Sequence, residues 1–341
     1  MPAPRMRRPR HPWRQRGVAV ITALLLTTLA VAIVASLFWQ QQVQVRSMEN
    51  QRLHLQTKWI LRGALDWSTL VLDTFRGQYT SLDQPWATPL AETRLDQYIE
   101  RERVEGENFD ATLSGNVTDA SSRYNLRNLA NASGSVTDQV AFFTNLLRTL
   151  QMQQSLADRI ADYVYATLPP VTAQTAGETP PGSTQPPATT TPQRRSTVSG
   201  KPISLLQVDD LLAVPGITQE MIERLRPFVT VLPSGNTLTT VNVNTAPPEL
   251  LAALVSNMSV SEANTLVAQR KQAPWKNKAD FTTALGNRTV IAGDSWDVTS
   301  DWFLVDSRIR LDRAALNAQA LIFRPSTPIA GGTRVMWIRE N

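Results

Sequence analysis

A long uncharged apolar run behind an arginine-rich leader constrains this chain more than any other feature. Six arginines and no acidic residue precede Gly17, and the 22 residues from Val18 to Trp39 carry no charge. About 20 apolar residues cross the hydrocarbon core of a bilayer as a helix, so this run is long enough for one membrane span. Because positive charge collects on the cytoplasmic side, we expect the leader in the cytoplasm and the residues after Trp39 on the opposite side.

The junction at Gly17 predicts how the leader is removed. A secretory signal peptide is cut after its apolar core, at a small-residue site, whereas the small residue precedes the core in this chain. A cut after Gly17 keeps the apolar run in the mature protein, with Val18 as its first residue. A plain, unprocessed membrane anchor is the alternative on hydropathy alone. The predicted anchor residues are Val18, Leu24, Leu25, Leu26, Phe38 and Trp39.

The positive charge of the chain belongs to the leader. The 341 residues carry a formal net charge of +5, and the leader contributes six arginines, so about −1 remains after Gly17. The hydrophobic fraction of 42% and the charged fraction of 18% are typical of a folded protein long enough for two domains. Since there is no cysteine, disulfides and thiolate metal sites are excluded.

Helical periodicity continues beyond the membrane run. No proline interrupts the residues from Val18 to Gln84, which predicts one helix of about 55 to 60 residues, apolar all round in its first half and amphipathic in its second. The helix region is expected to end at Pro85 and Pro89. One helical face is predicted from positions three, four or seven residues apart: Leu53, Ile60, Ala64, Trp67, Val71 and Phe75.

The remaining chain is predicted to run from strand to helices and back to strands. Alternating apolar residues predict a strand from Phe109, and the last strands are expected from Asp301 onward. Residues 169–202 hold eight prolines and few core residues, which predicts a flexible surface loop. Thr218 is the expected N-cap of a helix at Gln219–Leu225. That helix is the second of a helix–turn–helix unit predicted to begin at Ser204, with its turn at Pro215 and Gly216. The other predicted helices cover Leu95–Arg103, Val136–Leu150, Leu156–Val164, Asn244–Leu254 and Ser261–Arg270.

Several motifs occur together in one order along the chain. The leader junction is followed by Arg46, Glu49 and Asn50 beyond the membrane run, and then by three segments: Tyr124–Leu129, Leu211–Ile217 and Val241–Pro247. In this combination the chain resembles the K-type minor pseudopilins of the type II secretion system over nearly its whole length.

The resemblance implies an α+β fold with a pilin-like long N-terminal helix on an antiparallel sheet, interrupted by a large inserted α-helical domain with helix-hairpin-helix or SAM-like units. The expected divisions are a cleaved leader at 1–17, a transmembrane part at 18–39, the pilin-like domain at 40–129 and 287–341, and the insert at 130–286. It also implies a non-enzymatic tip subunit that starts or caps a periplasmic pseudopilus for export of folded proteins.

The resemblance further implies a location and a set of partners. The chain is expected in the bacterial inner membrane as a single-pass protein with a periplasmic C-terminal domain. Its expected partners are I- and J-type minor pseudopilins, the inner-membrane assembly platform, and a prepilin peptidase that cuts between Gly17 and Val18 and methylates the new amine. Related pilins carry glutamate at the fifth mature position, where this chain has Thr22. A subunit with nothing above it has no neighbouring amine to neutralise, so an uncharged residue there fits the tip.

The main alternative is a competence-type pilin that binds DNA. The unit Leu211–Leu225 resembles a helix-hairpin-helix, whose turn can present backbone amides to phosphates. Because nucleic-acid affinity depends on basic side chains, the near-neutral mature chain argues against nucleic acid as a partner. The modest basic patch available to this alternative consists of Arg224, Arg226, Arg270 and Lys271.

Catalytic and metal-binding motifs are sparse. The chain has two histidines, no cysteine, and no P-loop, Gly-x-Ser-x-Gly or His-Glu-x-x-His pattern, so an enzyme and a bound cofactor are not expected. Asp294, Asp297 and Asp301 lie close in sequence, with Asp306 beyond them. Carboxylate oxygens suit calcium, and relatives of this family can bind it, so these aspartates are the candidate calcium ligands. Their spacing does not match an EF-hand, and solvated surface aspartates are the alternative.

Overall fold

The computed structural model describes residues 16–95, 110–168, 204–233, 237–326 and 332–340. The chain forms two compact units, Met1–Trp59 and Ile60–Asn341. Helix α1 (Arg16–Thr74) is 59 residues long, so the prediction of a single helix of this length is confirmed. The helix ends at Thr74, eleven residues before Pro85.

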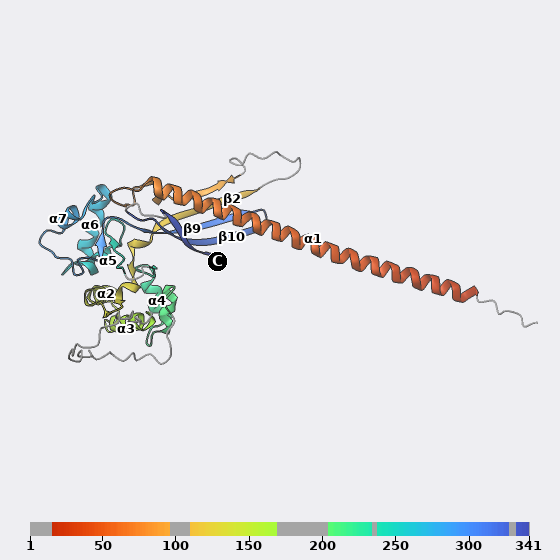
Figure 1. Ribbon diagram of the computed structural model, residues 1–341, viewed down its shortest axis with the longest axis horizontal. Coiled ribbons are helices and arrows are strands. Elements are labelled where there is room, and N and C mark those ends of the chain that lie inside the picture. The colour runs from red at the N-terminus through yellow and green to blue at the C-terminus, as the bar shows by residue number, and fades with distance from the viewer. Residues whose placement is uncertain (1–15, 96–109, 169–203, 234–236, 327–331, 341) are drawn as a thin grey trace, which may run out of the picture. The chain divides into compact units, whose positions relative to one another are not determined.

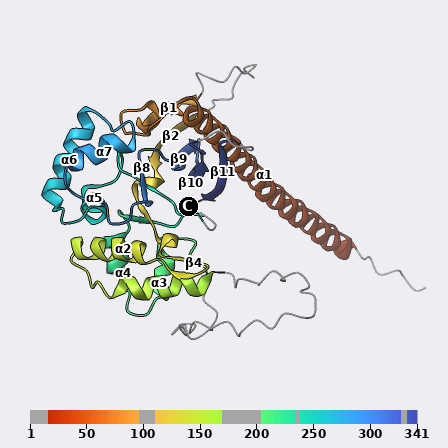
Figure 2. The ribbon, with the colours of Figure 1, turned by 60° about the vertical axis from the view of Figure 1, so that its left-hand side comes forward.

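In the second unit, α1 lies on one face of an antiparallel sheet (Figures 1 and 2). The five strands are ordered β1-β2-β9-β10-β11. Successive strands in this order are antiparallel, and β2 pairs with β9 from Ala111↔Leu311 to Asp119↔Phe303. The strands are β1 (Leu90–Arg94), β2 (Ala111–Asp119), β9 (Trp302–Leu311), β10 (Ala314–Phe323) and β11 (Arg334–Glu340).

The buried face of α1 differs from the predicted one. Ala64 is buried and Ile60 and Val71 pack against the core as expected, but Trp67 and Phe75 are exposed. The residues that α1 contributes to the sheet core are Leu61, Leu65 and Leu72, at the helical spacing of four and seven. The prediction was wrong for the two aromatic residues because α1 carries two apolar stripes, and periodicity alone cannot say which of them meets the sheet.

A helical domain is inserted between β2 and β9. Its elements share one hydrophobic core, and Figure 2 shows α2–α4 and α5–α7 as two neighbouring groups. The helices are α2 (Thr137–Thr149), α3 (Leu156–Thr167), α4 (Gln219–Leu225), α5 (Pro248–Leu254), α6 (Val260–Gln272) and α7 (Lys278–Leu285). Short 3-10 helices lie at η1 (Pro85–Ala87), η3 (Ala120–Ser122), η4 (Leu126–Leu129) and η5 (Val208–Ala213), and two-residue strands are β3 (Tyr124–Asn125), β4 (Ala130–Asn131), β5 (Gly134–Ser135), β6 (Val229–Thr230), β7 (Val241–Asn242) and β8 (Trp296–Asp297).

The core of the helical domain includes residues on both sides of the expected insert at 130–286. Tyr124 and Leu126 belong to the helical-domain core, and so do Trp296 and Val298 near the other border. The extended segment β3 pairs in parallel with β6 and not with the pilin-like sheet. An extended residue pair in the sequence does not reveal which sheet it joins, so the exact bounds of the insert stay a prediction.

Most local predictions in the described residues are confirmed. Thr218 caps α4, since its side chain accepts from the backbone N–H of Met221 at 3.3 Å. Helix α7 was not predicted, because its eight residues are too few to show a clear apolar period. The helix expected at 95–103 and the loop expected at 169–202 lie at least partly outside the described residues.

Candidate functional site

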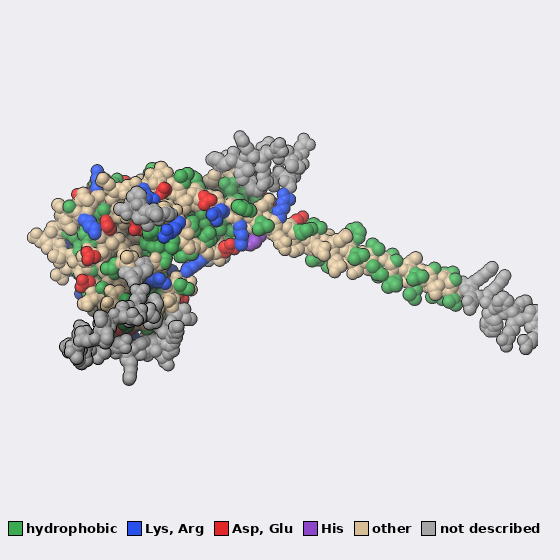
Figure 3. Space-filling model, viewed as in Figure 1, with side chains coloured by type: hydrophobic (Ala, Val, Ile, Leu, Met, Phe, Trp, Pro, Cys, Tyr) green, Lys and Arg blue, Asp and Glu red, His purple; other side chains and the backbone are tan. Residues whose placement is uncertain are grey.

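The N-terminal half of α1 is an apolar helix, and none of its most apolar stretch is buried by the part of the chain that the structure describes. Figure 3 shows it studded with hydrophobic side chains. Among the described residues, one helix is both long enough and apolar enough to span a membrane, and it is α1. Its most apolar stretch has a mean hydropathy of 2.7. Gly17 lies in the first turn of α1. The predicted anchor residues are all more than half exposed: Val18, Leu24, Leu25, Leu26, Phe38 and Trp39.

Thr22 satisfies its own polar group inside this helix. Its hydroxyl Oγ1 lies 3.0 Å from the backbone carbonyl oxygens of both Val18 and Ala19. Threonine hydroxyls commonly bond the carbonyl three or four residues earlier in a helix. Thr22 therefore carries no charge, and its hydroxyl donor is satisfied inside the helix; that this position marks a tip subunit stays a prediction.

The second apolar stripe of α1 lies away from its buried stripe. Trp67 and Leu70 are 53% and 64% exposed, and Gly63 lies one turn before Trp67 with no neighbouring atom within 4 Å of where a Cβ would be. Gly63, Trp67 and Leu70 follow the helical spacing of four and three, so they share one face. We call these three residues the outer stripe.

An apolar groove borders the outer stripe. It runs between α1 and strand β2, and the segment around Pro85 closes one side. Its apolar lining residues are Ala64, Trp67, Val71, Pro85, Trp86, Leu90, Leu113, Val117 and Val305. Uncovered apolar surface on a folded protein marks a binding surface more often than an isolated exposed residue does. The outer stripe and the groove together could receive another apolar helix.

The motif at Val241–Pro247 forms a buried polar junction between the sheet and the insert. Asn242 Nδ2, which carries two hydrogens, lies within hydrogen-bond distance of three acceptors: the Thr80 carbonyl at 2.9 Å, Asp119 Oδ2 at 3.0 Å and Ser300 Oγ at 2.7 Å. The hydroxyls of Thr245 and Ser300 each donate to Asp119 Oδ2 at 2.6 Å. The motif that carried the family resemblance therefore has a structural role here, because it fixes the insert to the sheet.

Burial raises the pKa of the Asp119 carboxyl, since desolvation outweighs the opposing hydrogen bonds from Ser300, Thr245, Ser121 and Asn242. Asp119 is 1% exposed and ends β2, where the chain enters the insert. Ser300 lies where the chain returns to β9. Sequence reasoning missed Asp119, and its only signal was a polar residue at the end of a predicted strand.

The three candidate calcium ligands are not gathered into one site. Among the described residues, no group of three or more His, Cys, Asp or Glu side chains is placed to hold a metal ion. Asp301 Oδ1 accepts from the backbone N–H of Ser326 at 2.7 Å, and burial raises the pKa of Asp301. Asp297 accepts from the N–H of Val298 and faces the Lys278 ammonium at 3.9 Å. Calcium binding at Asp294, Asp297 and Asp301 stays a prediction to which this geometry adds no support.

The candidate DNA-binding turn is occupied by the protein itself. Gly216 adopts a φ of +88°, and a Cβ there would lie 2.6 Å from Arg159 Nη1, while that atom donates to the Pro215 carbonyl at 3.1 Å. Three of the four predicted basic residues are engaged inside the chain. Arg224 donates to the Leu150 carbonyl, Arg226 pairs with Asp209 and Glu223, and Arg270 donates to the Val243 carbonyl. Contacts with carbonyls leave the charges of Arg224 and Arg270 in place, but Arg270 is buried and Arg226 is neutralised by two carboxylates, so the patch offers a phosphate backbone less charge than the sequence suggests.

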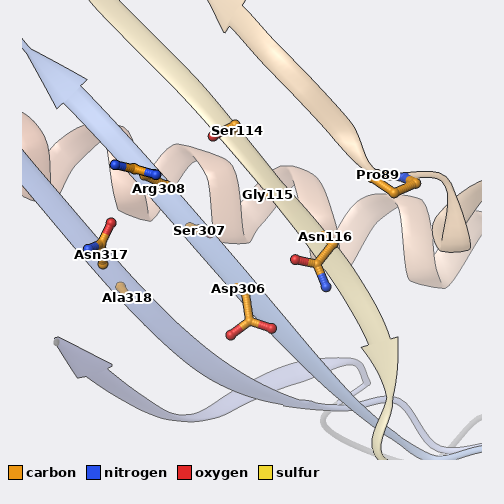
Figure 4. A pocket seen from close by; sticks show the side chains of 9 residues that line it. All are labelled: Pro89, Ser114, Gly115, Asn116, Asp306, Ser307, Arg308, Asn317 and Ala318. Atoms are coloured by element: carbon orange, nitrogen blue, oxygen red, sulfur yellow. The ribbon is translucent and has the colours of Figure 1, made fainter.

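An open polar depression lies on the sheet face that points away from α1. Figure 4 shows Asn116, Asp306, Arg308 and Asn317 projecting from β2, β9 and β10 toward the viewer, with α1 behind the sheet. Asp306 Oδ1 accepts from Gln319 Nε2 at 2.9 Å. The lining side chains include no histidine or cysteine, so the depression has no base–nucleophile pair of the familiar kinds.

Comparison with known proteins places these features in a family. Family models for "Type II secretion system (T2SS), protein K" match residues 122–234 and 241–296, which cover most of the insert. The type II secretion system protein K of Pseudomonas aeruginosa is 31% identical over 87% of this chain and 85% of its own length. The chain belongs to the type II secretion system protein K family.

Further comparisons agree with this membership. The protein K of Aeromonas hydrophila is 27% identical over 79% of this chain and 80% of its own length. The fold is similar to a chain of the crystal structure of the GspK-GspI-GspJ complex from enterotoxigenic Escherichia coli, with a TM-score of 0.61 at 19% identity. That likeness covers 86% of this chain and 99% of the other, and it confirms the α+β fold of a protein K family member with a long N-terminal helix on an antiparallel sheet.

Proposed function

We propose that this chain is a minor pseudopilin, a non-enzymatic tip subunit that starts or caps the pseudopilus of the type II secretion system. The observation that carries the proposal is the single long helix α1 in a protein K family member. Its first half is apolar and exposed among the described residues, and its second half packs on a sheet. Such a helix needs lipid or other helices around it. Before assembly, membrane lipid surrounds the apolar half of the helix. In the filament, helices of other subunits replace the lipid.

The leader and the anchor define the route to assembly in this proposal. A prepilin peptidase cuts between Gly17 and Val18 and methylates the new amine, and the helix holds the mature chain in the bacterial inner membrane with residues after Trp39 in the periplasm. The assembly platform then extracts it. The basic leader and the apolar run support this orientation.

The tip position is supported by two features. Thr22 stands at the fifth mature position, and its hydroxyl is satisfied by its own helix. Because it has no charge to pair, this position does not need the N-terminal amine that a subunit above it would offer. The insert adds a helical domain to the pilin-like sheet, and its bulk would obstruct further subunits stacking above it.

The partners proposed for the outer stripe are the helices of I- and J-type minor pseudopilins. The structurally similar chain was crystallised in a complex of GspK with GspI and GspJ. A glycine between larger apolar residues allows the backbone of a second helix to approach closely, and Gly63 has open space above it.

A test of the outer stripe is the variant Gly63→Leu. Glycine in a helix interior costs about 1 kcal/mol relative to alanine, and among the described residues no atom outside the helix's own nearby backbone lies within 4 Å of where a Cβ at Gly63 would be, so the isolated chain should unfold at the same or a higher temperature. We expect at least a tenfold loss of co-isolated minor pseudopilins and of secretion. Arg62→Leu is the matched control on the polar side of α1, where Arg62 pairs with Asp66 at 3.6 Å. Equal recovery of partners with both variants would remove the outer stripe from the interface.

A DNA-binding pilin is not favoured by any described contact. The turn expected to meet phosphates is capped by Arg159, and the neighbouring arginines bind carbonyls or carboxylates of the same chain.

A further inference from the structure

A buried arginine at the end of β10 connects three parts of the second unit. Arg324 is 2% exposed. Its Nη1 lies 3.1 Å from the Leu72 carbonyl oxygen and 3.5 Å from the Phe75 carbonyl oxygen. Its Nη2 lies 2.9 Å from Thr80 Oγ1 and 3.1 Å from the Ser300 carbonyl oxygen. One side chain thus bonds the end of α1, the segment after it, and the strand-side border of the insert.

The contact with α1 supplies what that helix end lacks. The last carbonyls of an α-helix have no partner inside the helix, and its C-terminal end carries partial negative charge. The last turn of α1 contains no basic residue of its own. Arg324 provides both the donors and the positive charge from a strand more than 240 positions away in sequence.

The second half of the arrangement is the polar junction around Asp119. Thr80 accepts from Arg324 through its hydroxyl and from Asn242 through its carbonyl, and its N–H donates to the Val298 carbonyl at 2.8 Å. The N–H of Ser300 donates to Thr80 Oγ1 at 3.2 Å. An unbroken series of hydrogen bonds therefore runs from the end of α1 through Arg324 and Thr80 to Asn242 and Asp119.

This series passes through both chain crossings between the sheet and the insert. The chain leaves the sheet at Asp119 and returns to it after Ser300. A two-stranded connection of this kind can hinge unless something locks it. Burying a guanidinium costs free energy, and Arg324 Nε has no acceptor among the described residues. The Phe303 ring, 4.5 Å from the guanidinium carbon, offsets part of that cost.

We propose that Arg324 is a positioning residue that locks the orientation of the inserted domain relative to the end of α1. Only the biological reason for this lock rests on the proposed function. A tip subunit that is moved by its helix must transmit that movement to the inserted domain. Leucine or methionine would fill the same volume without the buried charge, but neither can donate hydrogen bonds to three backbone carbonyls and one hydroxyl at once. Lysine keeps the charge and lacks the planar fork.

The test uses the absence of native cysteine. Spin labels at Asp66→Cys on α1 and Asp158→Cys on α3 report the helix-to-insert distance in the full chain in detergent, and both positions are exposed. We expect Arg324→Met to at least double the width of the distance distribution, Arg324→Lys to give an intermediate width, and Arg308→Met to leave it unchanged. Arg308 is an exposed arginine on the adjacent strand β9.

Hydrogen exchange separates positioning from general stabilisation. In Arg324→Met, the amides of Phe75, Thr80 and Ser300 should exchange at least tenfold faster, while amides inside α2 and α3 keep their rates. A width equal to that of Arg308→Met, or a uniform rise in exchange that includes α2 and α3, would overturn the proposal. If Arg324→Met cannot be purified, Thr80→Val removes one acceptor of the same series and should broaden the distribution in the same direction. These two measurements do not depend on any partner. If the proposed function were wrong, the unmodified chain would instead be isolated without other pseudopilins.

Discussion

Gly17→Leu is expected to abolish leader removal and, with it, secretion. The structure continues α1 through this residue in the unprocessed chain, and a peptide bond must leave the helix to enter a protease active site. Glycine weakens a helix by about 1 kcal/mol relative to alanine and has no Cβ to obstruct the enzyme. Leucine reverses both advantages, so uncut chain that starts at Met1 should accumulate.

The readout is the intact mass of the chain extracted from membranes, measured together with the export of a type II secretion substrate. Gly17→Ala is the control, since it adds one methyl group and should be cut more slowly but still detectably. A mature Gly17→Leu chain with normal export would contradict the processing step. An intact leader on the unmodified chain would instead favour the plain anchor.

Asp119→Ala is expected to lower the free energy of unfolding by about 3–5 kcal/mol, because three side chains and one backbone N–H lose their buried acceptor. For a unit of this size, the loss should lower the melting temperature by about 10 °C. Thermal unfolding of the full chain in detergent, followed by circular dichroism, measures it. Asp66→Ala on the exposed face of α1 is the matched control and should cost less than about 0.5 kcal/mol. A melting temperature for Asp119→Ala within about 2 °C of that control would show that the junction does not hold the insert.

The same carboxyl predicts a pH dependence with a defined sign. Burial raises the pKa of Asp119, so the folded state holds its proton more tightly than the unfolded state. The resulting stabilisation is fully present below the ordinary pKa of an aspartate and is lost as the pH rises through the raised value. Asp119→Asn should lack this loss, because an amide does not titrate in that range.

The long helix and the order of elements could be predicted from sequence because their signals are local. An uncharged run, a helical period and an N-cap at Thr218 each act within a few turns of the chain. The choice of which apolar stripe meets the sheet could not be predicted, since Trp67 and Leu65 are both apolar and only the tertiary fold buries one of them.

The polar junction and the arginine lock were out of reach for a related reason. Asp119, Asn242, Ser300 and Arg324 lie far apart in sequence and carry no shared motif. Their roles come from burial, which turns ordinary polar residues into obligatory partners of one another. The family resemblance drew attention to the segment Val241–Pro247. Its role in fixing the insert to the sheet is visible only in the structure, where Asn242 of β7 contacts Thr80 and Asp119.

Whether the chain is a tip subunit is decided by native mass spectrometry of the full chain, extracted from membranes of cells that carry the secretion system. We expect one copy of this chain, beginning at N-methylated Val18, in a complex with other processed pseudopilins. A chain recovered alone, or in many copies without other subunits, would contradict a tip subunit that assembles through α1.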